Sequence, residues 1–241
     1  MNINSNLYTP IAIVIAGIVV AGSILIIGHQ GGGSANANTA NTPSTQPSAT
    51  STVSADQVSS KGNPIVGSAN APLTIAYWFD YQCPYCKQNE LTVMPQLIKD
   101  YVDTGKVRIV YKDFSFLGPD SDTLGHWGRA VWQVAPDEFE AWHSAIYQNQ
   151  GEENTGWASI AEIQKITATV LTPAQTAQVA QLAVSNATQY QSAMDADKQE
   201  GEQDGVQGTP ALLIGTQWIN GAESYAQVKA VIDQQLAAGG K

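Results

Sequence analysis

Apolar and polar residues divide this chain into three parts. An uncharged apolar run fills residues 11–28, a stretch of small and polar residues covers 29–62, and strand-like and helix-like segments alternate over 63–241. Eighteen residues at a helical rise of about 1.5 Å each just span a hydrocarbon core of roughly 30 Å. We therefore expect a short tail at 1–10, a single transmembrane anchor, a flexible linker and a folded domain.

The apolar run has a second interpretation, a cleavable secretory signal, because residues 35–37 (Ala-Asn-Ala) resemble a small-residue cleavage site. The length of the run favours the anchor, since the apolar part of a cleavable signal typically has about 7 to 15 residues. Flanking charge gives no orientation, because no Lys or Arg precedes Lys61. The linker is too poor in apolar residues to order itself, and its typical reach is roughly 30 to 35 Å.

The domain opens with a pattern typical of a strand, a helix and a second strand. Residues 73–79 form a continuous apolar run, a helical stripe follows from 84 to about 103, and residues 107–111 are again mostly apolar. Pro95 lies inside the helical stripe, where it removes one backbone hydrogen bond. We expect it to kink the helix, because the periodicity resumes afterwards.

Helical periodicity continues over residues 120–204. Five helices are expected there, at 123–134, 137–147, 157–170, 173–184 and 187 to about 203. Strand character returns at 211–214 and 217–219, and an amphipathic helix from 224 to about 237 ends the domain. The pattern predicts an α/β sheet interrupted by an all-helical insertion.

The net charge argues against one class of binding partner. The formal net charge is −10 at pH 7, and of the charged residues only Asp56 and Lys61 precede the domain. An acidic domain of this kind argues against a nucleic-acid partner, because phosphate binding requires Lys and Arg. The acidity is typical of a solvated surface and indicates no particular chemistry.

The only two cysteines, Cys83 and Cys86, follow directly after the first predicted strand. Cys-x-x-Cys at a strand end is typical of a dithiol redox centre. With Pro84 in the first helical turn, Cys83 stands at the helix N-terminus, where free amides and the helix dipole lower the pKa of a thiol. Thiolate is the species that attacks and leaves in disulfide exchange, so this spacing predicts a redox-active pair.

Three other interpretations of the cysteines are weaker. A closed zinc site needs four Cys or His ligands, and the histidines are only His29, His126 and His143. A structural disulfide closing a four-residue loop removes little chain entropy. A thiol protease needs a base beside its cysteine, but histidines in a helical insertion and a second cysteine three residues away do not fit that class. We expect no metal and no cofactor.

The motifs occur together and in a fixed order. They are Ala-Pro-Leu-Thr-Ile at 71–75, Phe-Asp-Tyr-Gln-Cys-Pro-Tyr-Cys at 79–86, His126 with Ala130, Phe-x-x-Trp-His at 139–143, and Gly-Val-Gln-Gly-Thr-Pro at 205–210. In this the chain resembles, over about residues 63–238, the DsbA-like branch of the thioredoxin superfamily, which comprises extracytoplasmic thiol oxidoreductases. The resemblance implies a thioredoxin-like α/β fold with an inserted all-helical subdomain.

The resemblance also implies roles for individual residues. Cys83 would be the exposed nucleophile and Cys86 the buried resolving cysteine, with Pro84 and Tyr85 between them. A cis peptide bond would join Thr209 to Pro210 opposite the cysteines, where the backbone of the threonine pairs with an extended segment of substrate.

One position departs from the family. Tyr77 stands where relatives often have a buried acid that assists proton transfer to the second cysteine. Asp80 is a candidate replacement, although a solvated aspartate at the strand end is the alternative, because odd offsets along a strand point to opposite faces. Lys87 and Glu90 are expected as an exposed i,i+3 pair, with tuning of the Cys83 thiolate as their alternative role.

We therefore predict a single-pass membrane thiol-disulfide oxidoreductase whose domain lies outside the cytoplasm, since disulfides persist in oxidising compartments. It would oxidise cysteine pairs in exported proteins and be reoxidised by a membrane-embedded redox partner. A reductase or isomerase of the same fold and a tethered, non-catalytic protein-binding module are the alternatives. No dimerisation domain is evident, so we expect a monomer.

Overall fold

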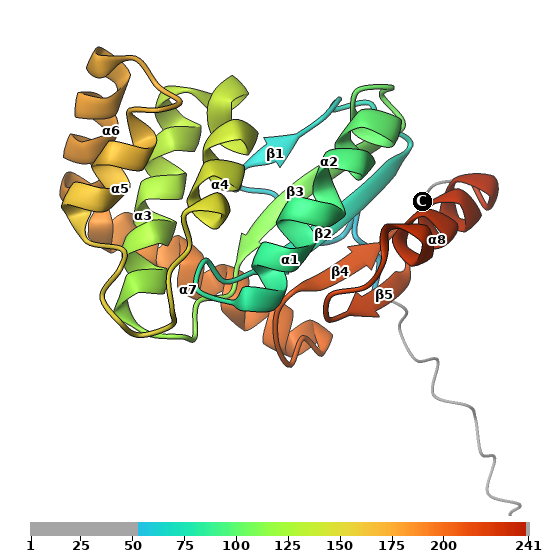
Figure 1. Cartoon of the computed structure of the whole chain (residues 1–241). Helices are drawn as coiled ribbons and strands as arrows, with labels where there is room; N and C mark the ends of the chain where they lie inside the picture. Colours follow the sequence, from blue (N-terminus) through green and yellow to red (C-terminus); the bar gives the residue numbers. More distant parts are fainter. Residues whose placement is uncertain (1–52, 240–241) are drawn as a thin grey trace, which may run out of the picture. The chain divides into compact units, whose positions relative to one another are not determined.

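A five-stranded sheet lies at the centre of the computed structural model, which describes residues 53–239 (Figure 1). The strands are β1 (Ile65–Val66), β2 (Leu73–Phe79), β3 (Val107–Asp113), β4 (Ala211–Ile214) and β5 (Gln217–Asn220). Their order is β1-β3-β2-β4-β5, with β2 parallel to β3 and every other neighbouring pair antiparallel. The predicted anchor at 11–28 lies outside the described residues. Between residues 53 and 239 no helix is long and apolar enough to cross a bilayer.

Most helices lie in the long segment between β3 and β4. The helices are α1 (Pro84–Thr92), α2 (Met94–Leu97), α3 (Pro119–Val134), α4 (Phe139–Gln148), α5 (Ile160–Thr167), α6 (Pro173–Ser185), α7 (Ala187–Asp204) and α8 (Tyr225–Ala237). Figure 1 shows α3 to α6 gathered to one side of the sheet. The predicted α/β fold with many inserted helices is confirmed.

The helix predicted over 84–103 is divided into three parts. Helix α1 ends at Thr92, α2 follows at Met94, and a π-helical turn completes the segment at Ile98–Val102. Pro95 lies at the start of α2, where its missing N–H interrupts the α-helical hydrogen-bond ladder. Val93, between α1 and α2, keeps right-handed helical angles and its N–H donates to the Asn89 carbonyl, so the helical course continues past Pro95 as predicted, although in three parts.

The two faces of the sheet carry separate cores because strand side chains alternate. Ile75 and Tyr77 of β2 belong to the large core, which also contains residues of α1, α3, α4 and α8. Ala76 and Trp78, one position along, belong to a smaller core on the other face. The Trp78 indole donates to the Asp197 carbonyl of α7 (3.2 Å), so α7 covers this second face.

Residues 53–62 correct the predicted linker, which was expected to be flexible as far as residue 62. Ala55 and Val58 are buried in the smaller core, and the Ala55 N–H donates to the Gly215 carbonyl (2.7 Å). The prediction is wrong for this part because Ala55 and Val58 pack in the same core as Trp78, so tertiary contacts order a segment whose own composition would not. We define residues 53–62 as the docked segment.

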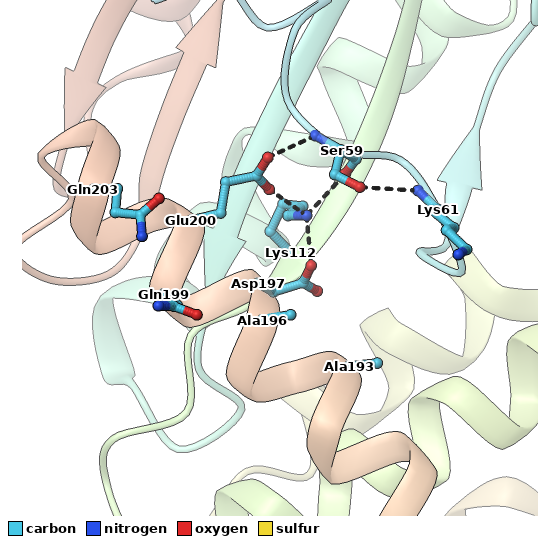
Figure 2. Close-up of a pocket in the computed structure, with 9 residues that line it drawn as sticks. All are labelled: Ser59, Lys61, Lys112, Ala193, Ala196, Asp197, Gln199, Glu200 and Gln203. Atoms are coloured by element: carbon cyan, nitrogen blue, oxygen red, sulfur yellow. Dashed lines mark hydrogen bonds and ion pairs between the residues drawn. The ribbon is translucent and has the colours of Figure 1, made fainter.

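The docked segment also closes a polar pocket beside α7 (Figure 2). The Ser59 carbonyl accepts a hydrogen bond from the Lys112 ammonium (2.8 Å), and the Ser59 N–H donates to Glu200 (2.8 Å). The Lys112 ammonium also forms an ion pair with Glu200 at 2.8 Å.

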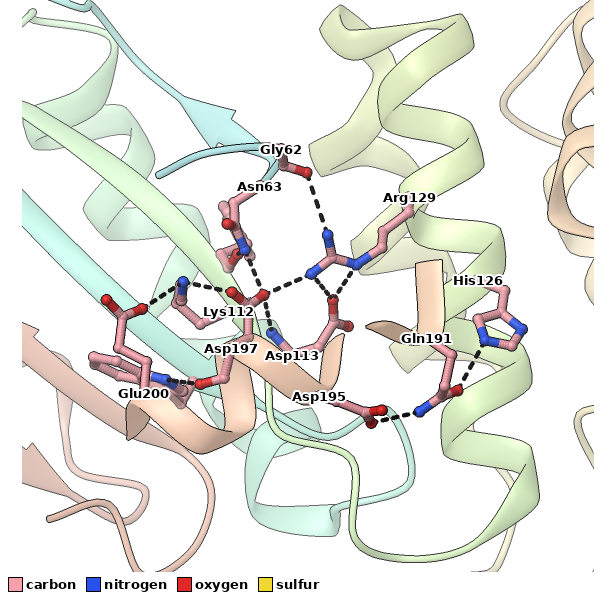
Figure 3. Close-up of polar contacts among 12 residues, drawn as sticks. Gly62, Asn63, Lys112, Asp113, His126, Arg129, Gln191, Asp195, Asp197 and Glu200 are labelled. Atoms are coloured by element: carbon pink, nitrogen blue, oxygen red, sulfur yellow. Dashed lines mark hydrogen bonds and ion pairs between the residues drawn. The ribbon is translucent and has the colours of Figure 1, made fainter. Parts of the chain in front are cut away.

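Below this pocket, a buried ionic network joins β3, α3 and α7 (Figure 3). The Asp197 carboxylate lies 2.5 Å from the Lys112 ammonium and 2.6 Å from the Arg129 guanidinium. Arg129 also pairs with Asp113 at 2.8 Å, and Asn63 donates to Asp197. All four charged side chains are nearly inaccessible to solvent. The Arg129 guanidinium also donates to the Gly62 carbonyl (3.3 Å), so the network connects the sheet to two inserted helices and to the end of the docked segment.

Candidate active site

The turn between β2 and α1 places Cys83 at the start of a helix, as the sequence predicts. Cys83 has extended backbone angles as the N-cap residue, and Pro84 follows in the first turn. The Cys83 N–H donates to the Asp80 carbonyl (3.1 Å), while the Cys83 carbonyl accepts from the Lys87 N–H (3.1 Å). The sulfur therefore lies where the free N–H groups of the helix end are available to a thiolate.

The two thiols are free, and their pKa values are shifted in opposite directions. Hydrogen bonding with Cys86 lowers the pKa of Cys83 from near 9 to about 6 against the effect of burial, and contacts with Thr209 and with the Tyr85 and Cys86 backbone contribute. Burial raises the pKa of Cys86 well above its usual value, and the neighbouring Cys83 raises it further. At pH 7 the pair therefore holds one thiolate, on Cys83, and one thiol.

Access to the pair differs from the expectation. Cys86 is fully buried, as the resemblance implies, but Cys83 is only 4% exposed rather than an open nucleophile. It is enclosed because its sulfur lies 3.4 Å from the Thr209 carbonyl oxygen. Tyr85, between the cysteines, is the exposed member of the motif at 62%.

The loop before β4 forms the other wall of the site. Thr209 and Pro210 are joined by a cis peptide bond, as the resemblance implies. The Thr209 hydroxyl is buried and has no hydrogen-bond partner within residues 53–239. A pocket of about 460 Å³ opens beside this loop. Its lining residues are Gly205, Gln207, Gly208, Thr209, Asn220 and Gly221.

Asp80 lies near the cysteines in sequence, but its carboxylate organises a different loop. One carboxylate oxygen accepts from the Phe116 N–H (2.8 Å) and the Leu117 N–H (3.1 Å). The other accepts from the Ser121 hydroxyl (2.6 Å) and the Gln82 N–H (2.8 Å). The residue is buried, so the prediction of a solvated aspartate is wrong. Four donors hold its carboxylate on the segment that leads into α3.

Helix α4 and Gln150, two residues beyond its end, hold the Cys83 turn in place. The Gln150 amide donates to the Tyr81 carbonyl (2.8 Å) and to the Cys83 carbonyl (3.1 Å). The Lys87 ammonium donates to the Gln150 carbonyl (3.2 Å), and the Tyr147 hydroxyl donates to the Asp80 carbonyl (3.0 Å). The sequence analysis missed this arrangement, because no local signal links Gln150 to a turn more than sixty residues earlier.

Glu90 is also placed differently from the expectation. It is 1% exposed, so the predicted exposed pair with Lys87 is wrong. Burial raises the pKa of the Glu90 carboxyl well above its usual value, and the charge of Glu140 raises it further. The sequence does contain a signal for the burial of Glu90. Glu90 follows the buried Cys86 by four residues, and residues i and i+4 share one face of a helix.

The histidines offer no base to the cysteines. His143 is fully buried, burial lowers its pKa to about 3, and its Nδ1 lies 3.1 Å from the Tyr81 hydroxyl. The His126 Nε2 lies 2.9 Å from the Gln191 side-chain oxygen. Within the described chain, no group of three or more His, Cys, Asp and Glu side chains is placed to hold a metal ion.

Comparisons with known proteins agree with this geometry. The model of a family described as thioredoxin matches residues 59–234. The chain is 28% identical over 171 residues to probable disulfide bond formation protein D of Bacillus cereus, covering 71% of this chain and 77% of that protein. It is 26% identical over 183 residues to disulfide bond formation protein D of Bacillus subtilis, covering 75% of this chain and 80% of that protein.

Solved structures are similar in fold. Oxidised BdbD from Bacillus subtilis matches with a TM-score of 0.67 and 24% identity, covering 77% of this chain and 98% of that one. Chlamydia trachomatis DsbA matches with a TM-score of 0.66 and 19% identity, covering 75% and 95% of the two chains. These similarities confirm the thioredoxin-like fold that the motifs imply.

Proposed function

Because the chain belongs to the thioredoxin family and is a thiol-disulfide oxidoreductase, we propose that its Cys83–Cys86 pair forms disulfides in proteins outside the cytoplasm. The observation that carries this proposal is the low pKa of Cys83, about 6. A stabilised thiolate stabilises the reduced enzyme, and a stable reduced form makes the disulfide a stronger oxidant. The similarity to proteins named disulfide bond formation protein D supports the same direction.

The reaction follows from the different acidities of the two sulfurs. A substrate thiolate attacks the Cys83 sulfur, the Cys83–Cys86 bond breaks, and Cys86 leaves with the electron pair and takes up a proton. The second substrate thiolate then attacks its neighbour in the mixed disulfide, and Cys83 leaves as a thiolate. The substrate loses two electrons and gains a disulfide, while the enzyme becomes reduced.

The proposed docking site for substrate lies around the exposed Tyr85 and the Thr209–Pro210 loop. An extended segment of substrate would pair with the backbone of Thr209 as an added strand, with its side chains in the pocket beside Gly208 and Asn220. Backbone pairing accepts many sequences, which suits an enzyme that acts on many proteins with cysteine thiols.

Location and reoxidation belong to the same proposal. Disulfides persist in oxidising compartments, so we place the domain outside the cytoplasm and assign the apolar run at 11–28 as its single-pass anchor. The reduced pair would pass its electrons to an oxidant embedded in the same membrane. An anchored enzyme would meet such a partner by diffusion in two dimensions.

The reduction potential of the Cys83–Cys86 pair tests the proposal. The protein is equilibrated with defined glutathione buffers, and the fraction of reduced pair is measured by thiol trapping. We expect a value between about −120 and −180 mV, the range of disulfide donors and isomerases. A value near −270 mV, as in thioredoxin, would instead indicate a reductase.

A Cys83→Ser variant is the control. It should lose all disulfide exchange with a reduced, unfolded substrate. If exchange is absent from the natural protein while binding of that substrate survives in the variant, the protein is a binding module and the proposal fails.

A further inference from the structure

Glu90 is a buried acid one helical turn beyond Cys86. Its spacing of four residues puts it on the same face of α1 as Cys86. Both carboxyl oxygens are shielded from solvent and have no hydrogen-bond partner within residues 53–239. A buried carboxyl without partners costs free energy, on the order of 1–3 kcal/mol for even a neutral polar group, so its presence beside a redox pair needs a reason.

The groups that face Glu90 come from three elements. Tyr77 comes from β2 and Tyr111 from β3, while α4 contributes Glu140, His143 and Tyr147. The nearest basic group is His143, whose Nε2 lies 3.7 Å from a Glu90 oxygen. Burial lowers the pKa of His143 to about 3, so it brings no positive charge to the carboxyl. Burial without a basic partner therefore favours the neutral form of the Glu90 carboxyl.

Tyr77 connects Glu90 to the redox pair. Its hydroxyl is buried, without a hydrogen-bond partner among the described residues. Burial raises the pKa of Tyr77 well above its usual value, and the charges of Cys86 and then of Glu90 raise it further. Both groups influence one hydroxyl, so the thiol, the phenol and the carboxyl lie in one cluster in the core.

We propose that Glu90 supplies the proton that Cys86 takes up when the Cys83–Cys86 disulfide is reduced. The proposal rests on the disulfide exchange described above and adds a group to it. When a substrate thiolate bonds to Cys83, Cys86 leaves as a thiolate. The carboxylic acid of Glu90 gives up its proton, Cys86 becomes a thiol, and Glu90 becomes a carboxylate. On reoxidation the same proton returns to Glu90.

Glu140 is the acidic neighbour of Glu90. It accepts a hydrogen bond from the Tyr111 hydroxyl, and it is partly exposed. It also lines a surface pocket of about 250 Å³ together with Trp132 and Asp137. Glu90 supplies the acid that the sequence lacks at position 77.

The test is the rate of disulfide reduction by dithiothreitol, followed by tryptophan fluorescence from pH 5 to 9 and divided by the concentration of dithiothreitol thiolate. General acids typically contribute about 10²–10⁴-fold to a rate, and water replaces part of this. We expect Glu90→Gln to lower the normalised rate constant at pH 7 by about tenfold or more. Glu90→Asp, which keeps the acid, should lie within about threefold of the natural protein. The exposed Glu162→Gln is the matched control and should have no effect.

A second variant distinguishes proton donation by Glu90 from a structural effect of the Glu90→Gln substitution. It also tests the proposal if Glu90→Gln does not fold. Glu140→Gln removes a charge that raises the pKa of Glu90. Glu90 then ionises at lower pH, so the pH above which the normalised rate falls should move down while the rate at pH 5 is unchanged. A rate for Glu90→Gln within twofold of the natural protein, or an unmoved profile for Glu140→Gln, would overturn the proposal. Reaction of the natural protein with dithiothreitol tests disulfide exchange itself, independently of Glu90.

Discussion

The low pKa of Cys83 is the property of a single residue on which the chemistry depends. The sulfur lies at the start of α1, near the Cys86 thiol and the helix N–H groups, and each of these stabilises a negative charge. Cys86, three residues later, is fully buried and has the opposite shift. The same motif therefore contains one sulfur, Cys83, that leaves the substrate as a stable thiolate, and one, Cys86, that must be protonated after it leaves.

Alkylation of the reduced protein tests this difference in acidity. The rate of reaction of Cys83 with iodoacetamide should rise with pH and reach half its maximum near pH 6, because only the thiolate reacts. Cys86 should stay unmodified up to pH 9. Mass spectrometry of quenched samples gives both rates. A midpoint near the ordinary cysteine value of about 8.5 would contradict the assignment, and the Cys86→Ser variant should show a raised midpoint because its thiol partner is gone.

Some residues of the site could be predicted from sequence and others could not. Cys83, Pro84 and Cys86 are adjacent in the chain, so their roles depend on local helix geometry that a short motif specifies. Gln150 acts through a contact with a distant turn, and its sequence neighbours give no sign of it. Glu90 has the right spacing for the buried face, but a charged residue is normally expected at the surface.

At the scale of elements, α7 owes its position to one buried carboxylate. Asp197 pairs with Lys112 of β3 and with Arg129 of α3, and all three side chains are at most 5% exposed. The replacement of a buried ion partner leaves uncompensated charge in a low-dielectric interior, which costs more than the pair itself contributes. The network therefore makes the contact between the sheet and the inserted helices specific to one arrangement.

Asp197→Ala should lower the free energy of unfolding by about 3–5 kcal/mol, because it leaves the Lys112 and Arg129 charges without their shared partner. Asp195→Ala is the matched control, since it removes an exposed aspartate from the same helix and should change stability by less than about 0.5 kcal/mol. Urea unfolding followed by circular dichroism measures both. Equal stability of the two variants would show that the network contributes nothing.

Elements with a clear apolar pattern were predictable from the sequence, and those ordered only by tertiary contacts were not. Strand β2 coincides with the predicted continuous apolar run because both of its faces are buried, and helix α6 matches its predicted range to within one residue. Strand β1 has only two residues, too few to show a period. The docked segment was predicted to be flexible from its composition, but Ala55 and Val58 are ordered by the apolar face around Trp78.

At the scale of the whole molecule, the inserted helices and the thioredoxin-like sheet depend on each other. Helix α4 fixes the Cys83 turn through Tyr147, and Gln150 beyond its end does the same. Helix α7 is joined to the sheet by the Asp197 network and covers one face of β2. A change at the cysteines is therefore coupled to the stability of the entire domain.

This coupling makes global stability depend on redox state and pH. In the reduced protein the folded-state pKa of Cys83, about 6, lies below its unfolded value near 9. Such a group contributes stability that is fully present above the unfolded pKa and is lost as the pH falls through the folded pKa. The oxidised protein has no thiolate, and closure of its four-residue loop contributes about 2 kcal/mol by chain entropy at any pH.

The reduced form should therefore gain stability relative to the oxidised form as the pH rises from 5 to 8. Urea unfolding of both forms at several pH values in this range measures the difference, and titrations shared by the two forms cancel in it. The Cys83→Ser variant, which cannot form the thiolate, should lose this pH dependence when it is compared with the oxidised natural protein. A constant difference between the two natural forms would mean that the Cys83 thiolate does not stabilise the fold, and the disulfide would then lack the driving force for donation to substrates.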